Sequence, residues 1–183
     1  LATSIFIATL TRDGQLSTDV PSAETFALML FALVGGVMMI SCGNLLMLFL
    51  GIEILSVCLY ILAGSRRGDI RSNEASLKYF LMGAFATGFL LFGIALIYGA
   101  SGSFHLQGIA DFVMQHKDTA PSFFFAGILL LMVGFAFKIA AVPFHFWAPD
   151  VYDGAPTHIT VFMTTVVKIA GIAAFYRVFQ TCF

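Results

Sequence analysis

Long apolar stretches separated by short polar segments dominate the pattern of this chain. A helix that crosses a bilayer needs about 20 mostly apolar residues. Five stretches meet this requirement: 24–43, 44–64, 75–100, 122–147 and 157–180. The first follows Pro21 and Ser22, a typical helix start, and only a tight turn around Gly43 separates it from the second. The pattern predicts an all-α polytopic membrane protein in which residues 1–183 form a single transmembrane domain.

Composition agrees with a lipid environment. Hydrophobic residues make up 60% of the chain and charged residues 10%, whereas soluble domains carry about 25% charged residues. The net charge of −1 provides no field that would attract nucleic acid. The cysteines at 42, 58 and 182 are far apart and show no CxxC spacing, so we predict buried thiols and no metal site.

The start of the chain predicts an internal fragment of a longer protein. The first residue is Leu1 and not methionine. Residues 1–10 are apolar, but they are too few to span a membrane and lack the basic region of a signal peptide. We expect them to be the tail of a preceding helix.

The basic residues indicate how the chain is oriented. Arg66, Arg67 and Arg71 lie together in segment 65–74. The positive-inside rule predicts that this loop is cytoplasmic. By alternation, segments 42–44 and 101–121 lie outside and segment 148–156 lies inside.

Three charged residues lie near the middle of predicted spans: Glu53, Lys138 and Lys168. An ionisable residue at the centre of a bilayer costs about 2.5–3.5 kcal/mol on insertion scales. We therefore expect these side chains to face one another, or water, inside the helix bundle. The alternative is that they form inert ion pairs that only hold helices together.

Polar neighbours extend two of these positions into helix faces. Ser56 and Tyr60 share the face of Glu53, at i+3 and i+7. Thr164 lies four residues before Lys168, on a polar stripe of the fifth stretch. A polar stripe in an apolar helix faces protein or water and not lipid.

The fourth stretch contains a helix-breaking residue beside its charge. Pro143 lacks an N–H, so it is predicted to free the carbonyl of Ile139, next to Lys138. His145 is predicted to share the face of Lys138 and to add a group that titrates near neutrality. Broken helices beside a charge at mid-membrane are typical of ion-transport sites. Our hypothesis is a buried lysine whose charge is switched by a mobile carboxylate.

Other charged and aromatic residues have simpler interpretations. Glu74 and Lys78 are four residues apart, which predicts a local ion pair, with a role in proton uptake as the alternative. Asp150 and Asp153 are expected to cap the fifth helix, with binding to a neighbouring subunit as the alternative. Trp147 suits the membrane interface as an anchor.

The stretch GFAFKIAAVPFHFWAPDVYDGAP at 134–156 resembles the subunit N family of bacterial complex I, the proton-translocating NADH:quinone oxidoreductase. Its mitochondrial counterpart is NADH dehydrogenase subunit 2. LFLGIEILSVCLYIL at 48–62 and NEASLKYF at 73–80 resemble the same family. The resemblance spans about residues 41–177. It implies an antiporter-like five-helix repeat with one proline-broken helix, and it places Glu53, Lys138 and Lys168 on the proton pathway.

The resemblance also implies a function and a location. The chain would belong to a translocase that moves protons as electrons pass from NADH to quinone in other subunits. It would hold no cofactor and no metal, because NADH, flavin, iron–sulfur clusters and quinone are expected in partner subunits. Its partners would be other membrane-arm subunits and the lipid bilayer of the bacterial inner (cytoplasmic) membrane. A multisubunit Na⁺/H⁺ antiporter, a membrane-bound hydrogenase of the same superfamily and a purely structural scaffold remain alternatives.

Overall fold

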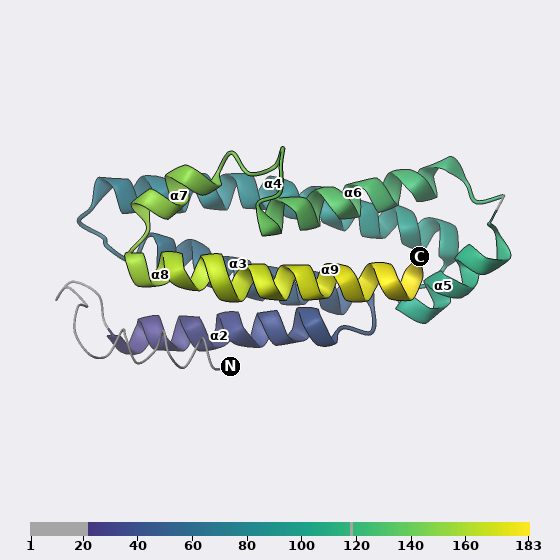
Figure 1. Cartoon of the computed structure of the whole chain (residues 1–183), viewed down its shortest axis with the longest axis horizontal. Coiled ribbons are helices and arrows are strands. Elements are labelled where there is room, and N and C mark those ends of the chain that lie inside the picture. The colour runs from purple at the N-terminus through teal and green to yellow at the C-terminus, as the bar shows by residue number, and fades with distance from the viewer. Residues whose placement is uncertain (1–21, 118) are drawn as a thin grey trace.

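The computed structural model describes residues 22–117 and 119–183, and its regular elements are all helical. The prediction for residues 1–10 lies outside this range. The elements, shown in Figure 1, are α2 (Ser22–Ser41), α3 (Leu45–Ala63), α4 (Ile70–Ser101), α5 (Leu106–Gln115), α6 (Ser122–Ile139), α7 (Ala148–Gly154), α8 (Thr157–Phe162), the π-helix η1 (Met163–Val167) and α9 (Lys168–Cys182).

Five helices in the described part of the chain are long and apolar enough to cross a bilayer. They are α2, α3, α4, α6 and the continuous run from α8 through η1 to α9. Large apolar side chains such as Phe31, Phe85 and Leu129 point outward and are mostly exposed. Such a surface is unfavourable in water but suits lipid. The predicted all-α membrane fold class is confirmed.

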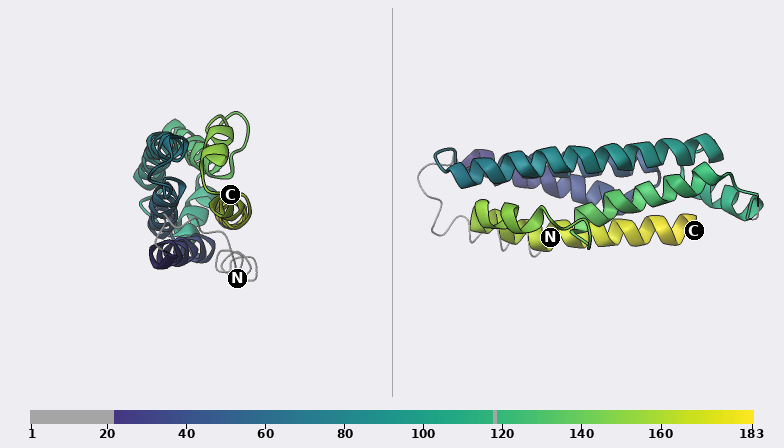
Figure 2. Two further views of the ribbon diagram at one scale, coloured as in Figure 1. Left: turned by 90° about the vertical axis from the view of Figure 1, so that its left-hand side faces the viewer. Right: turned by 90° about the horizontal axis from the view of Figure 1, so that it is seen from above.

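The long helices lie side by side in an elongated bundle (Figures 1 and 2). At one end, the turn after α2 meets the start of α5, where the Leu45 N–H donates to the Phe104 carbonyl and the Leu106 N–H donates to the Gly43 carbonyl. The α3–α4 connection and the junction of α7 with α8 lie at the opposite end (Figure 1). Segments predicted to share one side of the membrane therefore share one end of the bundle. The predicted cytoplasmic position of loop 65–74 stays a prediction.

Two pairs of glycines let neighbouring helices touch backbone to backbone. A Cβ atom placed on Gly51 of α3 would lie 2.9 Å from the Gly35 carbonyl oxygen of α2. A Cβ atom on Gly93 of α4 would lie 2.7 Å from the Gly127 carbonyl oxygen of α6. Small residues at crossings are how membrane helices gain packing energy, because lipid supplies no hydrophobic drive between them.

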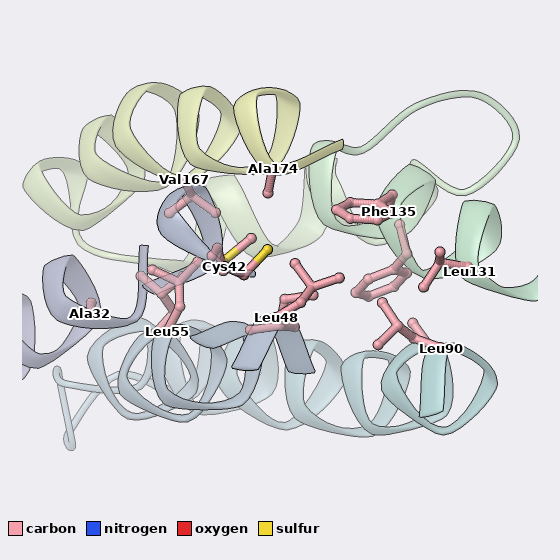
Figure 3. Packing of buried hydrophobic residues seen from close by; sticks show 14 of the residues in the cluster. Ala32, Cys42, Leu48, Leu55, Leu90, Leu131, Phe135, Val167 and Ala174 are labelled. Carbon is pink, nitrogen blue, oxygen red and sulfur yellow. The ribbon is translucent and has the colours of Figure 1, made fainter. Parts of the chain in front are cut away.

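The interior of the bundle is mainly apolar, and every spanning helix contributes side chains to it (Figure 3). Leu48 and Leu55 of α3 and Leu90 of α4 are fully buried, as is Phe135 of α6. The Phe135 ring meets Phe175 of α9 edge to face, with ring centroids 5.6 Å apart. Polar groups that enter this interior lose water and need partners within the protein.

Helix α4 begins at Ile70, five residues before the predicted start at 75. Asp69 is its N-cap, and its side chain accepts a hydrogen bond from the Arg71 N–H at 3.0 Å. Part of the predicted loop 65–74 is thus helical. With 32 residues, α4 is about 48 Å long, longer than a hydrocarbon core of about 30 Å.

The break in the fourth predicted span lies earlier than Pro143. α6 ends at Ile139, and Ala140 takes a left-handed conformation with φ of 56°. The Ala141 N–H bonds to the Ala136 carbonyl and the Ala140 N–H to the Phe137 carbonyl, which is a Schellman ending. The fourth stretch, 122–147 with its predicted break at Pro143, therefore forms a continuous helix only as far as Ile139. Residues 140–147 instead connect α6 to α7.

Candidate functional site

Lys138 lies one residue before the end of α6 and is almost fully buried, with 5% of its surface exposed. Its Nζ donates a hydrogen bond to Ser56 Oγ of α3 at 2.8 Å. The Ser56 hydroxyl donates in turn to the Ile52 carbonyl one turn earlier. A hydroxyl is a neutral partner and stabilises an ammonium less than a carboxylate does. The site therefore holds a buried amine on a polar group that carries no charge.

Glu53 lies three residues before Ser56, on the same side of α3. Its Oε1 atom is buried and has no hydrogen-bond partner among the described residues. None of the ion pairs in that part of the chain joins Glu53 to Lys138. The two predicted residues thus flank Ser56 without a direct ion pair.

Helix α9 passes close to the same point. A Cβ atom on Gly171 would lie 2.8 Å from Ile139 Cγ2 and 3.9 Å from Lys138 Cγ. The missing side chain at Gly171 allows α9 to approach the end of α6. Lys168 is three residues earlier on α9, so two of the three predicted charges lie on helices in close contact.

Lys168 contacts an aromatic ring. Its Nζ lies 5.7 Å from the centroid of the Tyr152 ring of α7, a distance at which a cation interacts with the π face. The Tyr152 carbonyl accepts a hydrogen bond from Thr160 Oγ1 at 3.1 Å. Partial burial raises the pKa of the Tyr152 phenol, so a neutral ring faces the lysine.

The π-helix η1 immediately precedes Lys168. Such a turn closes i→i+5 bonds and holds an extra residue, which rotates the following residues round the axis. The predicted stripe from Thr164 to Lys168 assumed a regular α-helix, so its register is altered here. Thr164 Oγ1 donates to the Thr160 carbonyl at 2.9 Å, within its own helix. Single π turns occur frequently at functional sites.

His145 does not share a helix face with Lys138. It is exposed in the connection between α6 and α7, because α6 ends six residues earlier at Ile139. The prediction that His145 lines the face of Lys138 is wrong for this reason.

Trp147 is buried in an aromatic cluster, with 3% of its surface exposed, and is not an interfacial anchor. Its ring stacks on Tyr79 with centroids 4.7 Å apart and on Phe137 with centroids 5.2 Å apart. Tyr60, predicted near Glu53, meets Tyr79 edge to face at 4.8 Å. The cluster therefore joins α3, α4, α6 and the start of α7.

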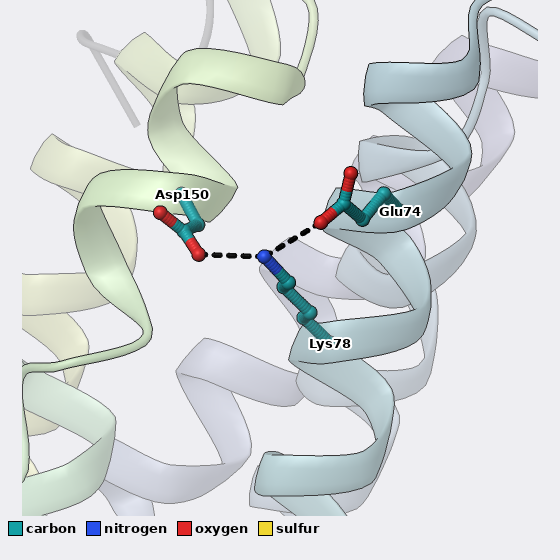
Figure 4. A network of polar contacts seen from close by, with 3 residues as sticks. All are labelled: Glu74, Lys78 and Asp150. Atoms are coloured by element: carbon teal, nitrogen blue, oxygen red, sulfur yellow. Dashed lines mark hydrogen bonds and ion pairs between the residues drawn. The ribbon is translucent and has the colours of Figure 1, made fainter.

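A second charged group lies where α4 faces α7 (Figure 4). Lys78 Nζ lies 2.7 Å from Glu74 Oε1 and 2.7 Å from Asp150 Oδ2. The predicted local pair of Glu74 and Lys78 is present. Asp150 pairs with α4 instead of capping the next helix, and the N-cap residue of α8 is Pro156, so the capping prediction is wrong.

Comparison with known proteins identifies the family. Residues 42–182 match the sequence model of the family described as "NADH:quinone oxidoreductase/Mrp antiporter, TM". The chain belongs to this family. The matched region runs from the turn before α3 to the end of α9, and it contains Glu53, Lys138 and Lys168.

Individual family members agree with the predicted resemblance to subunit N, which is confirmed. The chain is 52% identical to NADH-quinone oxidoreductase subunit N of Cytophaga hutchinsonii, over 98% of this chain and 38% of that protein. It is 40% identical to a chain of respiratory complex I from Thermus thermophilus with a TM-score of 0.78, covering 96% of this chain and 38% of that one. A chain of the membrane-bound sulfane sulfur reductase, an archaeal respiratory membrane complex, is 31% identical with a TM-score of 0.81, covering 98% and 37%.

Some contacts of the site had no signal in the sequence. Ser56 was placed on the face of Glu53, but nothing local pointed to its bond with Lys138. The contact of Tyr152 with Lys168 and that of Asp150 with Lys78 join different helices, and no spacing rule reports on such pairs. The acidic residues after Trp147 were the one sequence feature that suggested an ion pair in this region.

Proposed function

We propose that the chain is part of a membrane-arm subunit that translocates protons while other subunits pass electrons from NADH to quinone. The observation that carries this proposal is Lys138, a buried amine that rests on one hydroxyl at the end of a broken helix. The names of the relatives in Cytophaga and Thermus support the same activity. Because the chain spans 38% of those relatives' length, the activity of the whole protein is part of the proposal.

Lys138 takes up and releases the proton in this mechanism. A carboxylate that approaches its Nζ stabilises the ammonium form, and withdrawal of that carboxylate favours release, because burial removes the stabilising water. Glu53 is the carboxylate nearest in sequence to Ser56, and its buried Oε1 has no hydrogen-bond partner among the described residues, which leaves it free to change partners. Rotation of the Ser56 hydroxyl completes the connection between the two side chains.

Lys168 is the next proton site in the proposal, since α9 contacts α6 at Gly171 beside Lys138. The auxiliary groups are Tyr60, Thr164, Glu74 and His145. Glu74 and His145 are exposed on the surface of the described part of the chain. They would exchange protons with solvent, whereas Tyr60 and Thr164 would line the interior.

The redox groups belong to partner subunits in this proposal. Among the described residues, no group of three or more His, Cys, Asp or Glu side chains is placed to hold a metal ion. NADH, flavin, iron–sulfur clusters and quinone would bind elsewhere in the complex. The chain would lie in the bacterial inner membrane among other membrane-arm subunits, with loop 65–74 in the cytoplasm.

The test is NADH-driven proton uptake by inverted membrane vesicles that contain the assembled complex. Lys138→Ala should lower uptake strongly, while Lys117→Ala, which alters an exposed lysine beside α5, should leave it unchanged. The amount of assembled complex is measured in parallel. Unchanged uptake and unchanged quinone reduction in Lys138→Ala would mean that the buried charges are structural.

A second candidate is a subunit of another membrane complex with this fold. The 31% identity to the sulfane sulfur reductase chain supports it, because that complex shares the helix arrangement. The two candidates differ in what drives them. Proton movement that follows NADH oxidation in the native membrane favours the first, and movement that follows a sodium gradient favours an antiporter.

A further inference from the structure

Helix α7 is too short to be stable by itself. It has seven residues, and isolated helices shorter than about 12 residues are marginal even in favourable sequences. Its position must therefore come from the helices around it. Figure 1 shows it lying along α4, on the side of the bundle that also carries α8.

Three contacts attach the α7 region to α4, and they share one side of α7. The Trp147 ring stacks on Tyr79, and Asp150 pairs with Lys78. A Cβ atom on Gly154 would lie 2.6 Å from the Arg71 carbonyl oxygen, so the backbones touch there. Positions 147, 150 and 154 are spaced three and four apart, which places them on one helix face.

Other contacts of α7 lead to Lys168. The Tyr152 ring lies 5.7 Å from Lys168 Nζ, and the Tyr152 carbonyl accepts from Thr160 Oγ1. A shift of α7 away from α4 would therefore move the aromatic ring relative to the lysine. Helix α7 therefore connects Lys78 of α4 to Lys168 of α9, which is a proposed proton site.

The ion pair is the one contact of the three that depends on charge. In the described part of the chain, Lys78 is the only cation that forms an ion pair with a carboxylate of α7. Its Nζ lies between two carboxylates (Figure 4). Loss of the ammonium would leave Glu74 and Asp150 to repel each other across the gap between the helices. The pair borders a polar cleft of about 210 Å³, which Arg71 and Asp153 also line.

Lys78 lies where the charged start of α4 gives way to its uncharged part, and this position strengthens the attraction between the paired charges. No charged residue follows Lys78 on α4 through Ser101, so Lys78 marks the level where the uncharged part of the span begins. Ion pairs at such a boundary are screened less than pairs in open water.

We propose that Lys78 is a positioning residue that holds α7 against α4 through its paired carboxylates and so fixes Tyr152 against Lys168. This inference rests on the proposed function only where it concerns proton movement. The placement of α7 is a separate claim and is tested separately.

The first measurement is hydrogen–deuterium exchange of peptides covering residues 148–155 in the assembled complex. Lys78→Met should accelerate exchange there at least about threefold, because the short helix opens more often. Lys117→Met is the matched control and should leave exchange unchanged. Unaltered exchange in Lys78→Met would overturn the proposal.

The second measurement separates charge pairing from a direct role in carrying protons. The double variant Lys78→Glu with Asp150→Lys again places one ammonium between two carboxylates, now supplied from α7. We expect Lys78→Met to speed exchange and to lower the number of protons taken up per NADH oxidised. The double variant should restore both slow exchange and the original proton number. Slow exchange without recovery of proton uptake would make Lys78 a proton carrier and overturn its role as a positioning residue.

Failure of the proposed function would look different. If Lys138→Ala leaves proton uptake unchanged, the proton-translocation proposal fails, while the exchange result for Lys78→Met still decides whether α7 is held by the ion pair. Faster exchange in Lys78→Met with an unchanged ratio of protons to NADH would overturn the link from α7 to Lys168.

Discussion

Lys138 and Lys78 are both lysines on spanning helices, yet their surroundings are opposite. Lys138 is 5% exposed and contacts one neutral hydroxyl. The Lys78 side chain is 38% exposed and lies 2.7 Å from each of two carboxylates. Burial without a carboxylate in direct contact disfavours an ammonium, whereas carboxylates at contact distance favour it.

The difference separates a group suited to changing its charge from one suited to keeping it. A lysine beside two carboxylates holds its proton and can act as a fixed connection between helices. A buried lysine on a hydroxyl responds to small movements of nearby charge, because the protein interior screens charges poorly. We therefore propose that the same residue type serves proton transport at Lys138 and holds neighbouring helices together at Lys78.

Charge reversal should distinguish the two lysines most clearly. Lys138→Glu buries a carboxylate beside Ser56 and on the side of Glu53, and an uncompensated buried charge costs about 3–5 kcal/mol. We expect little assembled complex on native gels. Lys78→Glu should assemble, since its site is reached by water. Equal amounts of both variants in the assembled complex would contradict the assignment of Lys138 to the interior.

Removal of the partner of Lys138 should have the next largest effect. Ser56→Ala leaves a buried donor without its acceptor, a loss of about 1–3 kcal/mol, and should lower both thermal stability and proton uptake. Ser56→Thr keeps a hydroxyl and should restore both. At the other lysine, Glu74→Ala leaves Asp150 in place and should change stability little. A melting temperature that does not fall in Ser56→Ala would show that the hydrogen bond is dispensable.

The smallest effect concerns Tyr152 of α7, whose ring lies 5.7 Å from Lys168 Nζ. Burial raises the pKa of its phenol in the folded state. Below about pH 10 the phenol is neutral in both states and adds no pH dependence. Above that value the unfolded chain ionises first, so stability falls as pH rises toward the raised pKa. Tyr152→Phe keeps the ring against Lys168, and its thermal stability should fall less between about pH 9 and 11.

Most of the fold followed from local patterns. The five apolar stretches, the small residues and the charged residues at mid-span can each be read from residues close together in the chain. The predicted helix boundaries were wrong where the residues flanking a helix, and not its apolar pattern, set its start or end. α4 starts five residues early because Asp69 caps it. α6 ends at Ile139 because Ala140 follows it in a left-handed conformation that usually favours glycine.

The candidate site was predicted in its residues but not in its contacts. Glu53, Lys138 and Lys168 were identified from their cost in lipid, which depends on each position alone. The expected face of Lys138 with His145 failed because it assumed a helix that continues. The π turn at Met163–Val167 changes the register of the stripe at Thr164. The sequence shows no local signal for that turn, so the prediction assumed a regular helix.

The sequence by itself determined that this chain is a helical membrane protein with charges that must be buried, because lipid excludes unpaired polar groups from any span. Only the tertiary structure decided which partners those charges receive. Ser56 and Lys138 are 82 residues apart, and Lys78 and Asp150 are 72 apart. Such contacts depend on how each helix is rotated and where it crosses its neighbours. Rotation and crossing are set by packing over the whole bundle and not by the residues beside each charge.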